Sequence, residues 1–260
     1  MFIKDYFDIL ESKAPLSLSK AMVDNGAYDN SGLLINVHSE VKKVLFTLDL
    51  SKASIKRAKR LGVDTIVTHH PAIYTPIKTV DIDGDTELVA LATINGLNVI
   101  SMHLNLDIAN GGIDQELGSL LGNGKYKLVE NVVSENGYGR EFSVNCKLSE
   151  FRKQVRLKLS TKRDICYGNL NTFIKKGASF CGGGSSSALN AVKNGLTDAD
   201  LIVTSDMPHH VITALVESGK CIILVPHYSA ENYGFKKYYD WAKDQIKSVT
   251  TYFFIDKRFM

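Results

Sequence analysis

The sequence has few cysteines, and none of them is arranged as in a metal ribbon or a redox motif. The four cysteines stand at positions 146, 166, 181 and 221, and no two of them form a CxxC pair. This absence argues against a zinc ribbon and against a dithiol redox centre. Free thiols in a reducing cytoplasm are the default expectation.

Long apolar runs are also missing. No stretch approaches the roughly 20 apolar residues that a membrane span needs. The first residues, Met1 to Asp5, lack the charged-then-apolar pattern of a signal peptide. We therefore expect a cytoplasmic protein with no membrane partner.

The chain carries little net charge and no long basic run. Its formal charge of +3 is too small to indicate nucleic acid as a partner. The basic stretch from Lys52 to Arg60 has the pattern of a solvated helix face. With 260 residues, 44% of them apolar and 23% charged, the chain can bury a core of one large α/β domain or two small ones.

From residue 43 onward, short apolar segments alternate with helical ones, which predicts an α/β fold with largely parallel sheets. The predicted strands of this kind are 43–50, 64–68, 98–103, 199–204, 221–225 and 249–255. The middle of the chain has alternating polarity instead, with predicted strands at 127–134, 140–148, 164–167 and 172–180, and a helix that Ser149 caps. We predict an N-terminal α/β half at 1–125, a small α+β insertion at 126–180 and a C-terminal α/β half at 181–260.

Six of the seven histidines stand where an apolar run ends. In an α/β protein the carboxyl ends of the strands form one rim, and ligands bind there. Histidines and carboxylates brought to one rim indicate a metal site. The segments concerned are Thr68-His69-His70-Pro71, Met102-His103-Leu104-Asn105-Leu106-Asp107, Met207-Pro208-His209-His210 and Pro226-His227-Tyr228-Ser229-Ala230-Glu231.

The first two segments leave alternatives open. His69 and His70 reach one site only if the chain turns there, because adjacent residues of a strand point in opposite directions. They are otherwise two surface histidines at a strand end. His103, Asn105 and Asp107 project to one face if their segment stays extended. Asp107 is otherwise a cap for the following turn.

The last two segments are also ambiguous. His227 and Glu231 are four residues apart across a strand-to-helix junction. The helix dipole alone explains the glutamate but not the histidine. Asp206 and His210 either bind metal or hold the ligands and the substrate in place, and we favour the second role.

A loop rich in glycine and serine, Gly182 to Ser187, leads into a predicted helix. Its residues Gly182, Gly183, Gly184 and Ser185 let backbone N–H groups approach an anion. A tight structural turn explains the same residues equally well. The loop is no Walker motif, because no lysine follows.

Taken in order, these segments resemble the GTP cyclohydrolase type 2 homologue family, also called the NGG-interacting-factor-like family. The resemblance spans almost the whole chain. Its matching features are Asp29-Asn30-Ser31-Gly32, the His69-His70 and His103-to-Asp107 segments, Cys181 to Gly184, Ser205 to His210 and His227-x-x-x-Glu231.

The resemblance implies two α/β halves with a dinuclear metal site between them and assembly into a ring-shaped homohexamer. It also implies that the 130–180 segment is the compact version of a domain that some members carry at full length. His103 and Asp206 match positions that line the site. The implied metal ligands are His69, His70, Asp107, His227 and Glu231.

Two divalent ions that share a water molecule generate hydroxide near neutral pH, which suits hydrolysis. The implied ligands include no thiolate and are compatible with zinc, iron, manganese or nickel. We expect a metal-dependent hydrolase for a nucleotide or another small phosphorylated substrate, in which Glu231 or Asp107 bridges the ions or takes up a proton. The Gly182–Ser187 loop would receive the phosphate. The alternative is a non-enzymatic protein that carries metal or acts through a protein partner.

Overall fold

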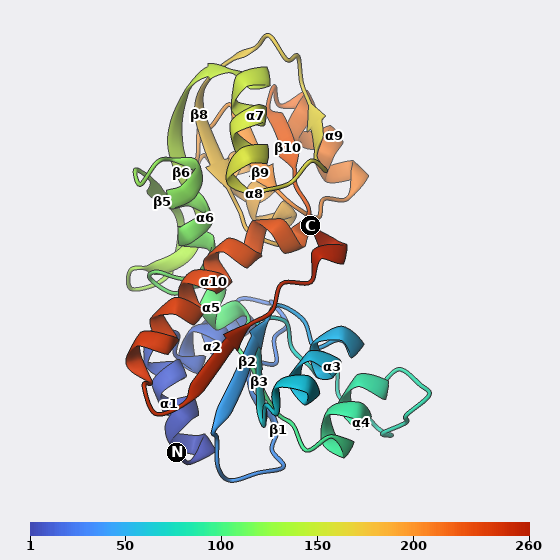
Figure 1. The fold of residues 1–260 in the computed structure, drawn as a ribbon. Coiled ribbons are helices and arrows are strands. Elements are labelled where there is room, and N and C mark those ends of the chain that lie inside the picture. The colour runs from blue at the N-terminus through green and yellow to red at the C-terminus, as the bar shows by residue number, and fades with distance from the viewer. The chain divides into compact units, whose positions relative to one another are not determined.

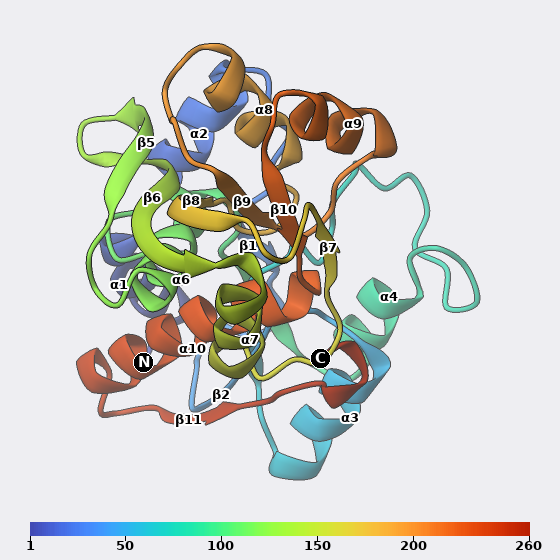
Figure 2. The same ribbon diagram turned by 90° about the horizontal axis from the view of Figure 1, so that it is seen from above.

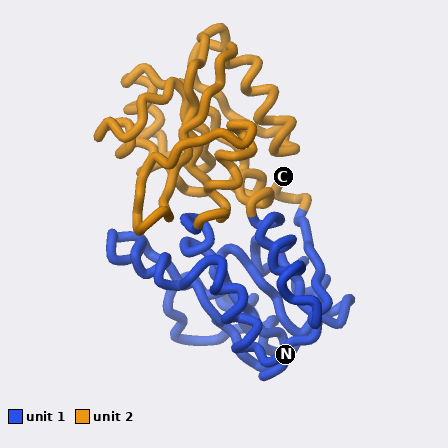
Figure 3. Tube along the Cα trace, turned by 90° about the vertical axis from the view of Figure 1, so that its left-hand side faces the viewer, with its two compact units in different colours: residues 1–109, 235–256 blue, residues 110–234, 257–260 orange.

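The computed structural model describes residues 1–260, which form a mixed α/β fold with two sheets (Figure 1). The chain divides into two compact units (Figure 3). Unit 1 consists of residues 1–109 and 235–256, and unit 2 of residues 110–234 and 257–260. Helix α10 (His227–Gln245) begins in unit 2 and ends in unit 1. No helix is long and apolar enough to cross a membrane.

Unit 1 is built on a five-stranded sheet. Its strands, in spatial order, are β1 (Gly32–Ile35), β4 (Asn98–Ser101), β3 (Thr65–Thr68), β2 (Lys43–Thr47) and β11 (Thr250–Phe253). All neighbouring pairs are parallel except β1 with β4. The helices of this unit are α1 (Ile3–Lys13), α2 (Leu16–Asp24), α3 (Lys52–Leu61), α4 (Glu87–Ile94) and α5 (Leu104–Ile108).

Successive side chains of strand β2 point to opposite faces of the sheet and pack into two separate cores. Leu45 belongs to the cluster that contains Ile55 of α3 and Val89 of α4. Phe46 points to the opposite face, where its ring lies 5.3–6.3 Å from three aromatic rings of α10. The sheet is therefore buried on both faces, as its continuous apolar strands predict.

Helix α3 is the element that the sequence predicts most closely. The Ser51 side chain accepts a hydrogen bond from the Ser54 N–H, and Ser54 accepts one from the Ser51 N–H, which makes a capping box. The helix ends at Gly62, whose φ of +63° is left-handed. The predicted cap and end are both confirmed.

Unit 2 is built on a six-stranded mixed sheet. Its strands, in spatial order, are β5 (Lys127–Val133), β6 (Asn136–Lys147), β8 (Phe173–Ser179), β9 (Leu201–Thr204), β10 (Cys221–Leu224) and β7 (Ile165–Tyr167). The pairs β8–β9 and β9–β10 are parallel, and the other three neighbouring pairs are antiparallel. The helices are α6 (Ile113–Leu121), α7 (Leu148–Lys158), α8 (Ser185–Lys193) and α9 (His209–Glu217), with a short 3-10 turn at Lys257–Phe259. Helices α8 and α9 cover one face and α6 and α7 the other (Figure 2).

The structure divides the chain differently from the predicted boundaries at residues 125 and 180. The 126–180 segment is no separate insertion, because β8 pairs in parallel with β9 and antiparallel with β6 at the centre of one sheet. At the other end, β11 pairs with β2 and returns the C-terminal segment to unit 1.

Two local predictions are also corrected. The residues from Leu104 to Ile108 form helix α5 and not an extended segment, with His103 at its N-terminal boundary. Helix α7 starts at Leu148, and no side chain caps it, so Ser149 lies inside the helix.

Candidate metal centre

The strand ends of unit 1 bring three histidines together. His69 and His70 follow β3, and both backbone N–H groups donate to the Leu48 carbonyl, at 3.1 and 3.0 Å. This shared acceptor turns the chain, so the two rings end 4.8 Å apart. The ring of His103, which follows β4, lies 5.2 Å from that of His69. One nitrogen from each of these residues lies within 4.8 Å of the others, a spacing that can hold a metal ion.

Each of these imidazoles donates its Nδ1–H to an oxygen. The acceptor is the Met102 carbonyl for His69, at 2.8 Å. The acceptors are carboxylates for the other two: Asp49 for His70 and Asp29 for His103, both at 2.7 Å. An imidazole that donates from Nδ1 is held in the tautomer whose Nε2 carries a lone pair, which is the form that binds metal.

Asp107 adds a carboxylate to this group. Its Oδ1 lies 3.5 Å from Nε2 of His69, and its side chain is 8% exposed. His103 and Asp107 are one helical turn apart, because the Asp107 N–H donates to the His103 carbonyl at the start of α5. Helical spacing therefore keeps them on one side, the outcome that the sequence analysis ascribed to an extended segment.

Asn105 does not join this group. Its side-chain amide donates to the Ala14 carbonyl at 2.6 Å.

The segment Asp29-Asn30-Ser31 positions His103. The Asp29 carboxylate accepts hydrogen bonds from His103, Ser19 and Ser31, and the Ser31 hydroxyl accepts the His103 backbone N–H at 3.1 Å. Burial is the largest influence on the pKa of Asp29 and raises it, but these hydrogen bonds, together with the positive charge that the His103 ring carries when it is protonated, lower the pKa to about 2. The carboxylate therefore stays ionised and fixes the imidazole.

Unit 2 contains a second group, in which both ring nitrogens of a histidine again face oxygen atoms. Nδ1 of His227 lies 2.5 Å from Oδ2 of Asp206, and its Nε2 lies 2.9 Å from Oε1 of Glu231. His227 and Glu231 occupy the first turns of α10, four residues apart on one side of the helix. The Glu231 carboxylate is 3% exposed.

The glycine loop packs directly against this second group. Gly182 has a φ of +54°, and a Cβ built there would lie 2.3 Å from Oε1 of Glu231 and 3.2 Å from Nε2 of His227. Only glycine permits both the backbone angle and the close approach. The neighbouring Gly183 has open space where its Cβ would be, and Gly184 is the N-terminal boundary of α8, followed by the buried Ser185.

A buried ion pair holds the loop. Arg140 and Asp114 are 2% and 0% exposed, and Nη1 of Arg140 lies 3.0 Å from Oδ2 of Asp114. Oδ1 of Asp114 accepts the Cys181 N–H at 3.1 Å, and the Tyr138 hydroxyl donates to the Cys181 carbonyl. Both backbone polar groups of Cys181, the residue that precedes Gly182, are thus fixed.

His210 lies apart from these groups. It is exposed at the start of α9 and has no hydrogen bond or ion pair with Asp206 or His227.

Sequence reasoning assigned no role to Asp49, Asp114 or Arg140. Asp49 lies next to the end of the predicted strand 43–50, so its place near the rim was a usable signal, but no histidine stands beside it in the sequence. Asp114 and Arg140 have no local signal, because their pairing joins residues 26 positions apart.

The donor chemistry fits divalent metal ions. In each unit a buried carboxylate faces the Nε2 of a histidine whose Nδ1 is already a donor: Asp107 faces His69, and Glu231 faces His227. Two lone-pair atoms at such distances repel unless a proton or a cation lies between them. The mixture of nitrogen and oxygen donors suits zinc, iron, manganese or nickel.

Comparison with known proteins gives consistent results. A model of the Duf34/NIF3 (NGG1p interacting factor 3) family matches residues 1–258. The protein named GTP cyclohydrolase 1 type 2 homolog of Clostridium perfringens is 31% identical over 238 residues, which cover 89% of this chain and 87% of the relative. The Methanocaldococcus jannaschii protein of the same name is 30% identical over 251 residues, which cover 95% and 96%.

The fold has also been seen in solved structures. A Bacillus cereus protein related to NIF3 aligns with a TM-score of 0.85 at 18% identity, covering 99% of this chain and 98% of the other. At that identity, the likeness establishes the fold alone.

Proposed function

The chain belongs to the Duf34/NIF3 (NGG1p interacting factor 3) family, and on this premise we propose that it is a metal-dependent hydrolase for a nucleotide-like substrate. One observation carries the proposal. Four imidazoles, of His69, His70, His103 and His227, donate Nδ1–H to oxygen acceptors and so present Nε2 as a ligand atom. Surface histidines at strand ends have no need of such orientation.

Two divalent metal ions per chain are the proposed cofactor. The proposed ligands are His69, His70, Asp107, His227 and Glu231, and the grouping of His103 with the first two makes it a further candidate. Bound ions of this kind lower the pKa of water and polarise a substrate oxygen. Five ligands over two ions leave positions open, which suits catalysis better than a purely structural role.

The protein's own residues prepare the site for hydrolysis. Asp49 and Asp206 fix the tautomer and the ring orientation of His70 and His227. The buried carboxylates of Asp107 and Glu231 are the candidates to take up the proton that an attacking water molecule loses. Gly182 keeps a Cβ out of the space around Glu231.

Guanine nucleotides are the first substrates to test, because two relatives carry the name GTP cyclohydrolase 1 type 2 homolog. The close approach of Gly182 to Glu231 gives this glycine a steric role that does not depend on a bound phosphate.

The hexameric ring that the family resemblance implies stays a prediction, and light scattering on the purified protein tests it.

The decisive experiment pairs metal content with turnover in matched variants. His70→Ala and Glu231→Ala should lose both metal and turnover of GTP, whereas His38→Ala and Glu217→Ala should keep both, because these two residues are exposed and belong to none of the groups that could hold a metal ion. Full metal occupancy in His70→Ala and Glu231→Ala would contradict the assignment of these two residues as metal ligands. Metal binding without turnover of any nucleotide in the screen would favour a metal carrier or regulator.

A further inference from the structure

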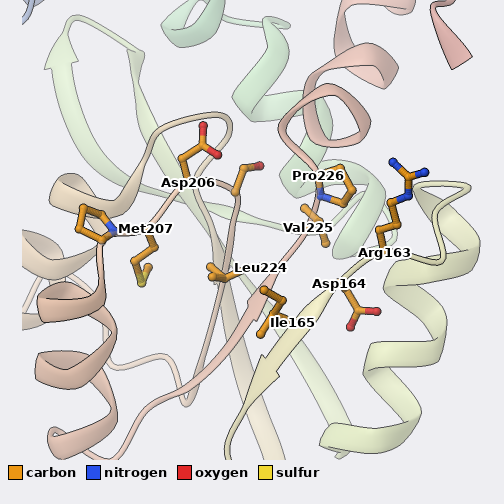
Figure 4. Close-up of a pocket in the computed structure, with 10 residues that line it drawn as sticks. Arg163, Asp164, Ile165, Asp206, Met207, Leu224, Val225 and Pro226 are labelled. Atoms are coloured by element: carbon orange, nitrogen blue, oxygen red, sulfur yellow. The ribbon is translucent and has the colours of Figure 1, made fainter. Parts of the chain in front are cut away.

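Unit 2 contains a cavity of about 580 Å³ beside the His227 group (Figure 4). It lies at the carboxyl ends of β9 and β10, the place where parallel sheets bind ligands. Its volume is in the range of about 300–1,000 Å³ that is usual for small-molecule sites. Asp206 lines the cavity and also pairs with His227, and Pro226, another lining residue, immediately precedes His227. One side of the cavity therefore belongs to the proposed reacting site.

The opposite side carries a cation that has no partner in the protein. Arg163 lines the cavity, is exposed, and its guanidinium makes no hydrogen bond or ion pair. Figure 4 shows Arg163 and Asp206 on opposite sides, with Val225 and Pro226 between them. The wall between the two charges is thus largely apolar.

The charges around Arg163 leave a positive excess. The side chain of the neighbouring Asp164 is fully buried, and its carboxylate is shared by two guanidiniums, those of Arg152 and Arg156. One carboxylate therefore faces two arginines, and none is left over to neutralise Arg163. An anion is the ligand that this edge of the cavity favours.

The backbone of Arg163 is fixed. Its N–H donates to the Thr161 hydroxyl at 3.1 Å, and that hydroxyl donates to the Arg163 carbonyl at 3.3 Å. Two residues later, Ile165 pairs with Leu224 at the edge of the sheet. The backbone that carries the arginine is therefore held at a set position along the cavity, which lowers the ordering cost of binding a ligand.

From these features we infer that the cavity binds a phosphorylated small molecule by its phosphate, which Arg163 holds away from the reacting group. The apolar wall carries the neutral middle of the molecule, and its reacting end lies at His227. The substrate class is thus a phosphate ester or nucleotide that is hydrolysed at a site other than its phosphate. The inference rests on the proposed function, because it takes His227 as part of the reacting site.

Binding titrations test the inference without any turnover. The probes are GTP, pyrophosphate and guanosine, and the variants are Arg163→Gln and Lys162→Gln. Lys162 is an exposed neighbour that does not line the cavity, so its variant makes the same charge change as a matched control.

We expect Arg163→Gln to weaken GTP and pyrophosphate binding by about 10-fold or more, the value of a lost charged hydrogen bond. Guanosine affinity and metal content should stay as in the unmodified protein, and Lys162→Gln should change none of these values by more than about 3-fold. Pyrophosphate should still bind after the metal is removed, because its contact is Arg163.

Equal effects of the two variants would overturn the inference, and so would the absence of saturable binding of GTP and pyrophosphate at millimolar concentration. Loss of pyrophosphate binding on metal removal would overturn it too, since the phosphate would then lie on the metals. The result stays separable from the proposed function. Anion binding that depends on Arg163 in a protein that hydrolyses nothing would refute the hydrolase alone.

Discussion

Replacing Gly182 with alanine should damage the unit 2 part of the proposed centre, and the adjacent Gly183 supplies a matched control. A Cβ at residue 182 would lie 2.3 Å from the Glu231 carboxylate and 3.2 Å from the His227 ring. A Cβ at residue 183 would meet nothing within 4 Å. The two variants therefore make the same chemical change in opposite surroundings.

The expected loss has two parts. A left-handed φ costs a residue other than glycine about 1–2 kcal/mol. Overpacking of a buried site costs a further 1–3 kcal/mol or so. Gly182→Ala should therefore lower the free energy of unfolding by about 2–5 kcal/mol, and Gly183→Ala by less than about 1 kcal/mol.

Two assays measure this difference. Urea unfolding of the metal-free proteins gives the free energies of unfolding. Zinc competition gives the metal affinity, which should fall by roughly 10-fold or more in Gly182→Ala, because the Glu231 carboxylate must move. Values for Gly182→Ala within about 0.5 kcal/mol and 3-fold of those for Gly183→Ala would refute the packing argument.

Further predictions concern residues that act through the histidines or the glycine loop. Asp49→Asn removes the charged partner of His70, and zinc competition should show affinity lower by roughly 10- to 100-fold; unchanged affinity would contradict the orienting role. Because the pKa of Asp29 is lowered in the folded protein from 3.8 to about 2, it contributes stability above pH 4 that is lost as the pH falls to about 2, on the order of 2 kcal/mol. Between pH 4 and pH 2, the free energy of unfolding of metal-free Asp29→Asn should therefore fall by about 2 kcal/mol less than that of the unmodified protein. An equal fall in the two proteins would argue against this contribution of Asp29. Arg140→Met should lower the free energy of unfolding in urea by about 3–5 kcal/mol, because it leaves the Asp114 carboxylate buried without its guanidinium; a loss below about 1 kcal/mol would show that the pair is not needed.

Features with a local cause were predictable from the sequence. The helix from Lys52 to Leu61 follows from a serine cap and a terminal glycine, and both signals lie within it or beside it. The ends of β3, β4 and β10 were predictable in the same way, because a histidine follows each apolar run in the sequence. The family resemblance drawn from these segments is confirmed by the match of the family model over residues 1–258.

Features that depend on pairing across the chain were not predictable. The place of β8 between β6 and β9 decides that residues 126–180 share a sheet with the segments that follow, and alternating polarity does not reveal a partner strand. The form of the segment from His103 to Asp107 was missed because a spacing of four residues fits one helical turn as well as one face of a strand. Asp49 was missed because its contact with His70 arises only when β2 and β3 pair.

The most direct test of the central claim is the metal content per chain, measured by mass spectrometry on protein purified without chelator and without affinity nickel. A dinuclear site of five ligands predicts about two ions per chain. The metal found would then be the one to use in the nucleotide screen. Less than about half an ion per chain, not restored by added metal, would contradict the claim that the oriented histidines of this protein form a working metal centre.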